Sequence, residues 1–275
     1  MLELAVLAEN SVKIISNLQG EHGLSIYLKC DGLEVLFDTG ASDLYLRNAA
    51  KLDINLSCID WIVFSHHHYD HVGGLKYFQS ENGKKVKILA QKYAFYPRVD
   101  YPNDLADRNI TARYETVSVD SEPIFLSEDF IFLASIPRLN NFECKDGFHE
   151  RKVLLSCEKL EDDFCPDDSA LIYKSSGGII VITGCSHSGI CNIVHYAKQI
   201  AAKYWNISNV KSIIGGLHLI NSKPEFLQNT INLLRDYGVE QIFPCHCTDL
   251  AAKIALAKAD FKVGDVNSGT IMKFL

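Results

Sequence analysis

The sequence predicts an α/β fold, in which short strands alternate with amphipathic helices. Three observations support this prediction. Short apolar runs rich in β-branched residues recur along the chain and are bounded by turn residues. Longer stretches instead repeat their apolar residues at helical spacing. In the second half of the chain the two patterns alternate, which is typical of strands joined by helical connections.

The apolar runs are expected to form strands in both halves of the chain, and the first half is the richer in strands. In the first half they lie at residues 2–7, 24–30, 35–37, 59–64 and 86–90. In the second half they lie at residues 124–135, 170–174, 179–183, 212–214 and 241–243.

The clearest helix is expected at residues 224–237. Ser222 is a suitable cap, Pro224 suits the first turn, and Gly238 stands where a helix-ending glycine is expected. Further helices are expected at residues 41–51, 189–204 and 249–259, the last with Thr248 or Asp249 as its cap.

The chain is expected to form one domain of 275 residues, because its length supports a full core and no linker is evident. Residues 93–165 are less regular and hold four of the seven prolines. This segment is either an inserted lid or a set of long connections.

Composition excludes several classes of partner. The formal charge is −7 and no block of lysines or arginines is present, so a nucleic acid is not expected. No apolar run approaches the ~18 residues of a membrane span, and the first residues do not resemble a signal peptide. Nine cysteines occur without a CxxC pair, which favours free thiols in a reducing cytoplasm. A small-molecule substrate fits these limits, and the oligomeric state is left open.

The segment FSHHHYDHVGG, residues 64–74, carries the most specific chemical signal. It follows an apolar strand, so His66, His68, Asp70 and His71 can turn toward one point in a strand-to-helix loop. Imidazole and carboxylate groups are good ligands for zinc and also suit iron or manganese. Two pairs of ligands allow one or two ions, and two ions can ionise a shared water. The alternative is a histidine-rich surface loop that binds metal without a function.

These residues make the sequence similar to the metallo-β-lactamase superfamily, whose signature is the pattern His66-x-His68-x-Asp70-His71. The segment around Asp38, FDTG, resembles the superfamily's first motif, in which the aspartate supports the metal loop by hydrogen bonding. The resemblance implies a four-layer αβ/βα sandwich, an α/β fold that some schemes class as α+β. A plain turn aspartate is the alternative for Asp38, and both interpretations make it a supporting residue.

The resemblance also implies a bridging ligand and a late histidine. His246 follows the strand at 241–243 and matches the late histidine, while Cys245 and Cys247 are expected to pack. At the bridging position the sequence has Thr-Gly-Cys185 where relatives commonly have Thr-Gly-Asp. Either the Cys185 thiolate or His187 is expected to bind metal there, or both. For the third motif His149 is the one histidine available.

His218, in the segment GGLHL, follows the strand at 212–214. It is a candidate proton donor to a leaving group, with Asp70 as the other catalytic candidate. The alternative is a capped, buried histidine.

Several segments resemble the narrower dihydropterin-methyl-(ribofuranosyl)aminobenzene-phosphate synthase-like group, among them GCSHSGI at 184–190 and GGLHL at 215–219. This resemblance implies that the reaction joins a dihydropterin-methyl diphosphate to an arylamine ribose phosphate. It also implies that a set of polar residues lies near the substrate, with a surface ion pair or loop anchor as the alternative for each: Glu21, His22, Arg138 and Glu143.

The sequence therefore leaves three candidate functions. The first is a metal-dependent hydrolase or transferase, with a zinc-type and dinuclear centre, that acts on a phosphorylated or diphosphorylated small molecule. The second is a general metallohydrolase of lactones, thioesters or cyclic phosphodiesters. The third is a non-catalytic metal or redox sensor that uses its cysteines.

Overall fold

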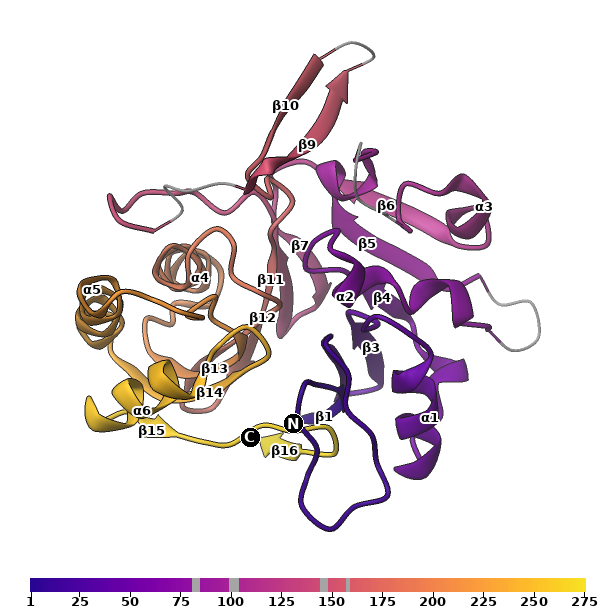
Figure 1. The fold of residues 1–275 in the computed structure, drawn as a ribbon. Coiled ribbons are helices and arrows are strands. Elements are labelled where there is room, and N and C mark those ends of the chain that lie inside the picture. The colour runs from indigo at the N-terminus through magenta and orange to yellow at the C-terminus, as the bar shows by residue number, and fades with distance from the viewer. Residues whose placement is uncertain (81–84, 99–103, 144–147, 157–158) are drawn as a thin grey trace. The chain divides into compact units, whose positions relative to one another are not determined.

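The computed structural model describes residues 1–80, 85–98, 104–143, 148–156 and 159–275 (Figure 1). Contacts divide the chain into two compact units. The first unit contains Met1–Ser121, Asp146–Asp167 and Val266–Phe274, and the second contains Glu122–Lys145, Asp168–Asp265 and Leu275. Residues 93–165 contribute to both units, and the single domain with an inserted lid stays a prediction.

The first unit is built on a seven-stranded mixed sheet with the order β16-β1-β2-β3-β4-β5-β6. Strands β3 to β6 are parallel, and β16, β1, β2 and β3 pair antiparallel. The strands are β1 Leu2–Ala8, β2 Ser25–Cys30, β3 Leu33–Phe37, β4 Trp61–Val63, β5 Lys87–Gln91, β6 Glu115–Val119 and β16 Ile271–Phe274. A separate hairpin joins β9 Phe148–Ser156 to β10 Lys159–Asp163.

The core of the first unit lies between this sheet and its short helices. Leu36, Ile62 and Ile88 occupy equivalent positions on three neighbouring strands and are fully buried. Helix α1, Leu44–Lys51, adds Leu44 and Tyr45 to the same core. Other short helices among the described residues are α2 Tyr69–Val72 and α3 Arg108–Thr111, with 3₁₀ turns at Leu56–Cys58, Leu75–Tyr77 and Lys92–Phe95. The position of β4 in the middle of this sheet brings the histidine cluster to a strand end.

The second unit contains another seven-stranded mixed sheet, with the order β15-β14-β13-β12-β11-β8-β7. Strands β12 to β15 are parallel, whereas β7, β8, β11 and β12 pair antiparallel. The strands are β7 Ile124–Ser127, β8 Phe130–Leu133, β11 Ala170–Ser175, β12 Gly178–Thr183, β13 Val210–Gly216, β14 Val239–Cys245 and β15 Lys262–Val263.

Three helices cover one face of this second sheet (Figure 1). They are α4 Ile190–Trp205, α5 Pro224–Asp236 and α6 Leu250–Lys258. Every residue of β12 is buried, as is typical of an inner strand of a parallel sheet. The parallel strands β12, β13 and β14 end at one edge of the sheet, where Thr183, Gly215 and Pro244 are in register.

The structure differs from the predicted elements at several places, and strands β6, β9, β15 and β16 lie where no strand was predicted. The run at 124–135 is a hairpin of β7 and β8, because residues 128–129 turn between them. Strand β10 includes the acidic residues Glu161, Asp162 and Asp163, whose polarity hid it from an apolar pattern. Lys223, rather than Ser222, is the cap residue of α5, whereas Asp249 caps α6 as expected.

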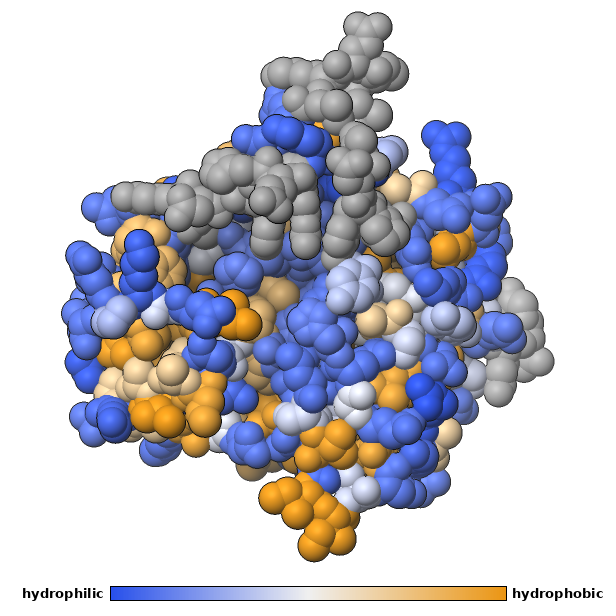
Figure 2. All heavy atoms as spheres, viewed as in Figure 1, coloured by the Kyte–Doolittle hydropathy of each residue, from blue (hydrophilic) through white to orange (hydrophobic). Residues whose placement is uncertain are grey.

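No helix in the described part of the chain is long and apolar enough to span a membrane. Figure 2 shows polar side chains interspersed with small hydrophobic areas on the visible face. The most exposed hydrophobic side chains include Ile14 and Ile15, which lie in the loop between β1 and β2.

Candidate metal centre

Three segments of the first unit are joined by backbone hydrogen bonds around the histidine loop, residues 65–71. The amide of Leu24 donates to the carbonyl of Asp70 over 3.0 Å, and the amide of Thr39 donates to the carbonyl of His71 over 2.7 Å. Gly74 donates in turn to the carbonyl of Gly40 over 3.0 Å. The segments that carry the sequence motifs therefore support one another within this unit.

Glycine is required where these segments pack most closely. A Cβ atom on Gly74 would lie 2.1 Å from the carbonyl oxygen of Thr39 and 2.7 Å from that of Ser42. A Cβ atom on Gly23 would lie 2.8 Å from the carbonyl oxygen of Asp70. These contacts are with backbone atoms, which cannot move aside as a flexible side chain can.

Asp38 fixes the orientation of two histidines. It follows β3 with a φ of 59°, a left-handed conformation that aspartate tolerates better than most residues. Its Oδ2 atom lies 2.7 Å from Nδ1 of His71 and accepts the Ser65 hydroxyl over 2.7 Å, while Oδ1 accepts the Ser65 amide over 2.8 Å. Because a carboxylate can only accept, His71 carries its proton on Nδ1 and presents the lone pair of Nε2.

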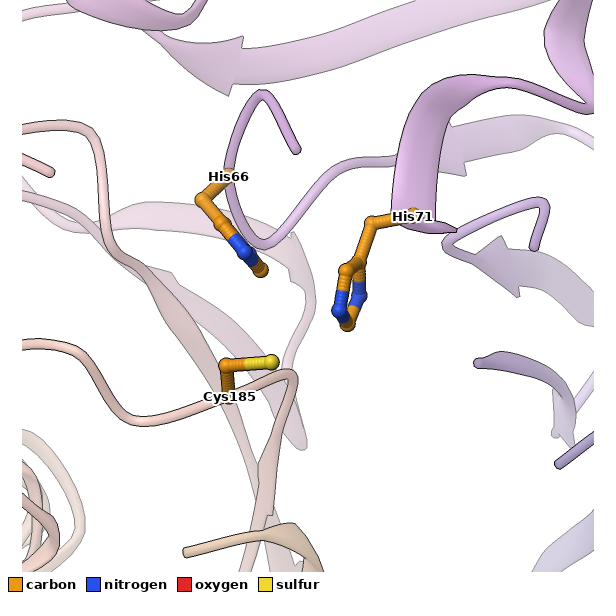
Figure 3. A group of neighbouring side chains, drawn as sticks. All are labelled: His66, His71 and Cys185. Atoms are coloured by element: carbon orange, nitrogen blue, oxygen red, sulfur yellow. The ribbon is translucent and has the colours of Figure 1, made fainter. Parts of the chain in front are cut away.

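Ser65 has the same effect on His66. The Ser65 hydroxyl gives its proton to Asp38, so it accepts from Nδ1 of His66, which lies 2.8 Å away. His66 therefore also presents the lone pair of its Nε2 atom. The rings of His66 and His71 have centroids 4.2 Å apart and converge in Figure 3.

The spacing of His66 and His68 suits a shared metal ion. The Nε2 atom of His66 lies 3.0 Å from Nδ1 of His68. Two nitrogen ligands of a tetrahedral zinc ion lie about 3.3 Å apart, from the usual zinc–nitrogen distance. The imidazoles are buried, and their outer nitrogens are held by the protein. The residues of the first unit therefore fit a metal, and the donor set favours zinc while allowing iron or manganese.

Two further predicted residues lie beside this loop. Nε2 of His22 is 3.3 Å from Oδ2 of Asp70, and the His22 side chain is 60% exposed. The carboxylate of Glu21 instead accepts the amides of Ala41 and Ser42 over 3.0 and 3.3 Å. Glu21 thus anchors the segment after Asp38, which agrees with the loop-anchor alternative.

His67, the histidine between the two predicted ligands, points into a buried ionic cluster of the first unit. Its Nε2 atom lies 3.1 Å from Oδ2 of Asp163, and its Nδ1 atom lies 3.0 Å from Oδ2 of Asp167. Arg98 donates to the same Asp163 oxygen over 3.0 Å. Burial lowers the pKa of His67, but the attraction of Asp167 and the hydrogen bonds to both carboxylates outweigh burial and raise it. A protonated His67 balances the cluster, with two positive and two negative groups.

The predicted residues of the second unit gather where parallel strands end. Cys185, drawn in Figure 3, follows β12, and His218 follows β13. His246 follows β14 with a φ of 54°, and Cys247 comes next in the chain. The donor atoms of Cys185, His246 and Cys247 lie within 4.8 Å of one another. Thiolate and imidazole groups are zinc ligands, so the second unit carries a compatible donor set of its own.

Hydrogen bonds link this second set to His218 and His187. The thiol of Cys247 accepts the amide of His218 over 3.3 Å and donates to the carbonyl of Cys185 over 3.5 Å. The ring centroids of His187 and His218 are 4.5 Å apart. A Cβ atom on Gly216 would lie 2.6 Å from the Cys247 sulfur, so only glycine leaves room for this thiol.

The other predicted substrate contacts lie elsewhere in the second unit. Glu143 accepts the amides of Cys191 and Asn192 over 3.0 and 3.2 Å, at the first turn of α4. Both of its oxygens are thus used by a helix N-terminus, a favourable position for a carboxylate. Arg138 is half-buried in the preceding loop, and the side chain of His149 lies outside the described residues.

Sequence reasoning did not identify several of these residues. Cys247 was expected to pack beside the metal site and was considered a metal or redox group only for a sensor, but its sulfur lies within 4.8 Å of the donor atoms of Cys185 and His246. Asp163 and Asp167 lay in a segment without a recognised motif. Asp163 and Asp167 contact His67 across 96 and 100 positions of the chain, respectively, and the carboxylate of Asp167 accepts the His67 amide over 2.8 Å. No local pattern signals such contacts.

Comparison with known protein families gives one match over most of the chain. The model described as the metallo-beta-lactamase superfamily matches residues 19–198. A Methanocaldococcus jannaschii protein named 7,8-dihydropterin-6-methyl-4-(beta-D-ribofuranosyl)-aminobenzene-5'-phosphate synthase is 31% identical over 292 residues, covering 99% of this chain and 97% of the relative. An uncharacterized protein of the same organism is 32% identical over 251 residues, covering 86% and 88% of the two chains.

A solved structure extends the similarity to three dimensions. The crystal structure described as a metal-dependent hydrolase of the beta-lactamase superfamily aligns with a TM-score of 0.84 and 28% identity, covering 99% of each chain. The resemblance and the fold class expected from the sequence are both confirmed by these matches.

Proposed function

Because this chain belongs to the metallo-β-lactamase superfamily, we propose that it is a metal-dependent enzyme that acts on a phosphorylated or diphosphorylated small molecule. The observation that carries the proposal is the convergence of His66 and His68, whose Nε2 and Nδ1 atoms lie 3.0 Å apart. Asp38 and Ser65 hold the opposite nitrogens of His66 and His71. Histidines that are fixed in this way lose little freedom when they bind a metal.

The proposed ligands of the first unit are His66, His68, Asp70 and His71. We also propose Cys185, His187 and His246 of the second unit as metal donors, which makes a dinuclear centre possible. When bound, a zinc-type ion supplies a Lewis acid and an ionised water. Asp70 and His218 are the proposed groups for moving protons, and His22 supports Asp70 from 3.3 Å. The cytoplasm is the proposed location, on the evidence of nine cysteines without a CxxC pair.

The substrate class comes from the named relative. Its name describes a product with a dihydropterin, an aminobenzene and a ribose phosphate. In a transfer of this kind, the pterin methylene forms a bond to the arylamine nitrogen while its bond to diphosphate breaks. The amine proton leaves, and diphosphate is released. Hydrolysis is the second candidate reaction, since the aligned solved structure is described as a metal-dependent hydrolase.

Metal content tests the first part of the proposal. Anaerobically purified wild type is compared with His66→Ala, Cys185→Ala, His187→Ala and the control His195→Ala, a histidine of α4 outside the proposed donor set. We expect about one or two ions per chain in the wild type and the control, and a loss in His66→Ala. The proposal would be contradicted if the wild type contains no metal as purified and binds none of zinc, iron or manganese when they are added.

Turnover tests the second part. The metal-loaded protein is incubated with a dihydropterin-methyl diphosphate, with and without an arylamine ribose phosphate, and diphosphate release is measured. Release that requires the amine indicates transfer, and release without it indicates hydrolysis. A metal-loaded protein that releases no diphosphate from this substrate and no phosphate from simpler esters would argue for a general metallohydrolase of carbonyl substrates or a sensor.

A further inference from the structure

The segment Asp163-Phe164-Cys165-Pro166-Asp167 faces the histidine loop within the first unit. Its three alternate polar residues contact two successive histidines. Asp163 and Asp167 contact His67, and the sulfur of Cys165 lies 3.6 Å from Nε2 of His68. All three side chains are fully buried. We propose that Asp163, Cys165 and Asp167 are positioning residues that set the orientation of His68 and His66 for metal binding, an inference that rests on the proposed function.

Cys165 acts on His68 directly. The Nδ1 atom of His68 faces Nε2 of His66, and its Nε2 atom faces the Cys165 sulfur. A thiol sulfur that accepts the Nε2 proton leaves Nδ1 free to bind the ion, in the same way that Asp38 leaves Nε2 of His71 free. Cys165 has a φ of 48°, and its amide donates to Oδ1 of Asp163 over 2.9 Å, which holds the sulfur in place.

Asp167 acts through the backbone. Its Oδ2 atom accepts the amide of His67 over 2.8 Å and also contacts the ring of His67. This fixes the residue between His66 and His68 with its side chain turned away from them. Consecutive residues of an extended segment point to opposite sides, so turning His67 away directs His66 and His68 toward the same side.

The trio of His67, His68 and Cys165 could instead be taken for a metal site, because its donor atoms lie within 4.8 Å of one another. The contacts of His67 argue against this. Both of its ring nitrogens face carboxylates, and Nη2 of Arg98 lies 3.1 Å from Nδ1. A cation placed beside His67 would meet the buried guanidinium of Arg98. The trio is therefore better explained as a clamp on the loop.

Metal affinity and the cobalt spectrum test the inference. The variants are Asp167→Asn, Cys165→Ala and Cys165→Ser. The matched controls are Asp162→Asn, a neighbouring, half-buried carboxylate that pairs with Lys152, and Cys30→Ala, a buried thiol at the end of β2. Affinity for Zn²⁺ is measured by competition with a chelating dye, and unfolding by urea is measured on the same samples. We expect Asp167→Asn and Cys165→Ala to bind Zn²⁺ about 10- to 100-fold more weakly. Cys165→Ser should recover part of this loss, because its hydroxyl can also accept the His68 proton.

The Co²⁺-loaded variants give a readout that a merely structural role would not change. At full loading, Asp167→Asn should show an altered ligand-field spectrum, while the controls match the wild type. If Asp167→Asn does not fold, the two Cys165 variants decide the question. Wild-type Zn²⁺ affinity in both Cys165→Ala and Asp167→Asn would overturn the inference. Loss of a sulfur-to-cobalt charge-transfer band in Cys165→Ala alone would also overturn it, because Cys165 would then be a metal ligand. A wild type that binds no metal would instead overturn the proposed function.

Discussion

The Oδ2 atom of Asp38 lies 2.7 Å from Nδ1 of His71, and the same oxygen accepts the hydroxyl of Ser65, whose partner is His66. One buried carboxylate at the end of β3 thus sets the orientation of two histidines that follow β4. Both carboxylate oxygens of Asp38 accept hydrogen bonds. Replacing either oxygen by an NH₂ group would therefore place two hydrogen-bond donors against each other.

Asp38→Asn should weaken metal binding about 10- to 100-fold, as is usual for partners of metal-binding histidines. The asparagine keeps the shape of the side chain. In one orientation, however, its NH₂ group faces the proton on Nδ1 of His71, and in the other it faces the amide of Ser65. A competition titration with Zn²⁺ measures the effect. Asp53→Asn is the control, since Asp53 is exposed and has a left-handed φ of 57° that asparagine tolerates well. Equal affinity in the two variants would contradict the role of Asp38.

Removal of metal should lower the thermal stability of the protein. A ligand that binds only the folded state at 100 times its dissociation constant adds about 2.7 kcal/mol. For a chain of this size that corresponds to a rise in Tm of roughly 5–10 °C. Thermal unfolding is followed after chelation and again after Zn²⁺ is restored, with His66→Ala and His195→Ala beside the wild type. We expect His195→Ala to respond like the wild type and His66→Ala to respond little. If the protein holds metal but its Tm is the same before and after chelation, metal binding does not stabilise the fold.

The sequence predicts the histidine loop well because its signal is local. His66, His68, Asp70 and His71 lie in one short segment after an apolar strand, and the structure places that segment at the end of β4. The strands with continuous apolar runs, such as β12, were also predicted within one or two residues. Such segments are determined mainly by residues that are close together in the chain, and a single sequence shows those residues directly.

Contacts between distant segments could not be predicted in the same way. The hydrogen bond between His67 and Asp167 spans 100 residues, and that between His218 and Cys247 spans 29. Glu21 illustrates a related limit. The sequence indicates a polar residue near the loop, but the use of its carboxylate by Ala41 and Ser42 depends on how the segments pack. Strand β10 was missed because Glu161, Asp162 and Asp163 are acidic, and the buried Asp163 pairs with the distant His67.

Gly74→Ala should disrupt the first unit. The new methyl group would lie 2.1 Å from the carbonyl oxygen of Thr39, and both backbone segments are fixed by hydrogen bonds. The loss of stability should exceed about 4 kcal/mol, which is at the extreme of single substitutions. Soluble yield and the urea midpoint measure it. Gly177→Ala is the control, because the nearest atoms at Gly177 belong to the flexible side chain of Lys211 at 3.3 Å. If both alanine variants unfold at the wild-type urea concentration, the close packing of Gly74 is not required.

Asp249→Ala should lower the free energy of unfolding by about 1 kcal/mol, the usual cost of losing a helix cap. Oδ1 of Asp249 accepts the amide of Ala252 at the start of α6 over 2.8 Å, and Oδ2 accepts the amide of Asn221 over 2.8 Å. Asp236→Ala is the control. Asp236 is an exposed carboxylate at the end of α5, where a negative charge has no favourable interaction with the helix dipole.

The effect of Asp249→Ala should also depend on pH. The amides of Ala252 and Asn221 hold the pKa of Asp249 below its usual value, so the folded state binds this proton less tightly than the unfolded state does. The stabilisation is therefore complete above the ordinary aspartate pKa of about 3.9 and is lost as the pH falls through the lower folded value. Urea unfolding of the wild type and Asp249→Ala should differ at pH 7 and converge below about pH 4. A difference that stays constant over this range would mean that the cap does not depend on the charge of Asp249.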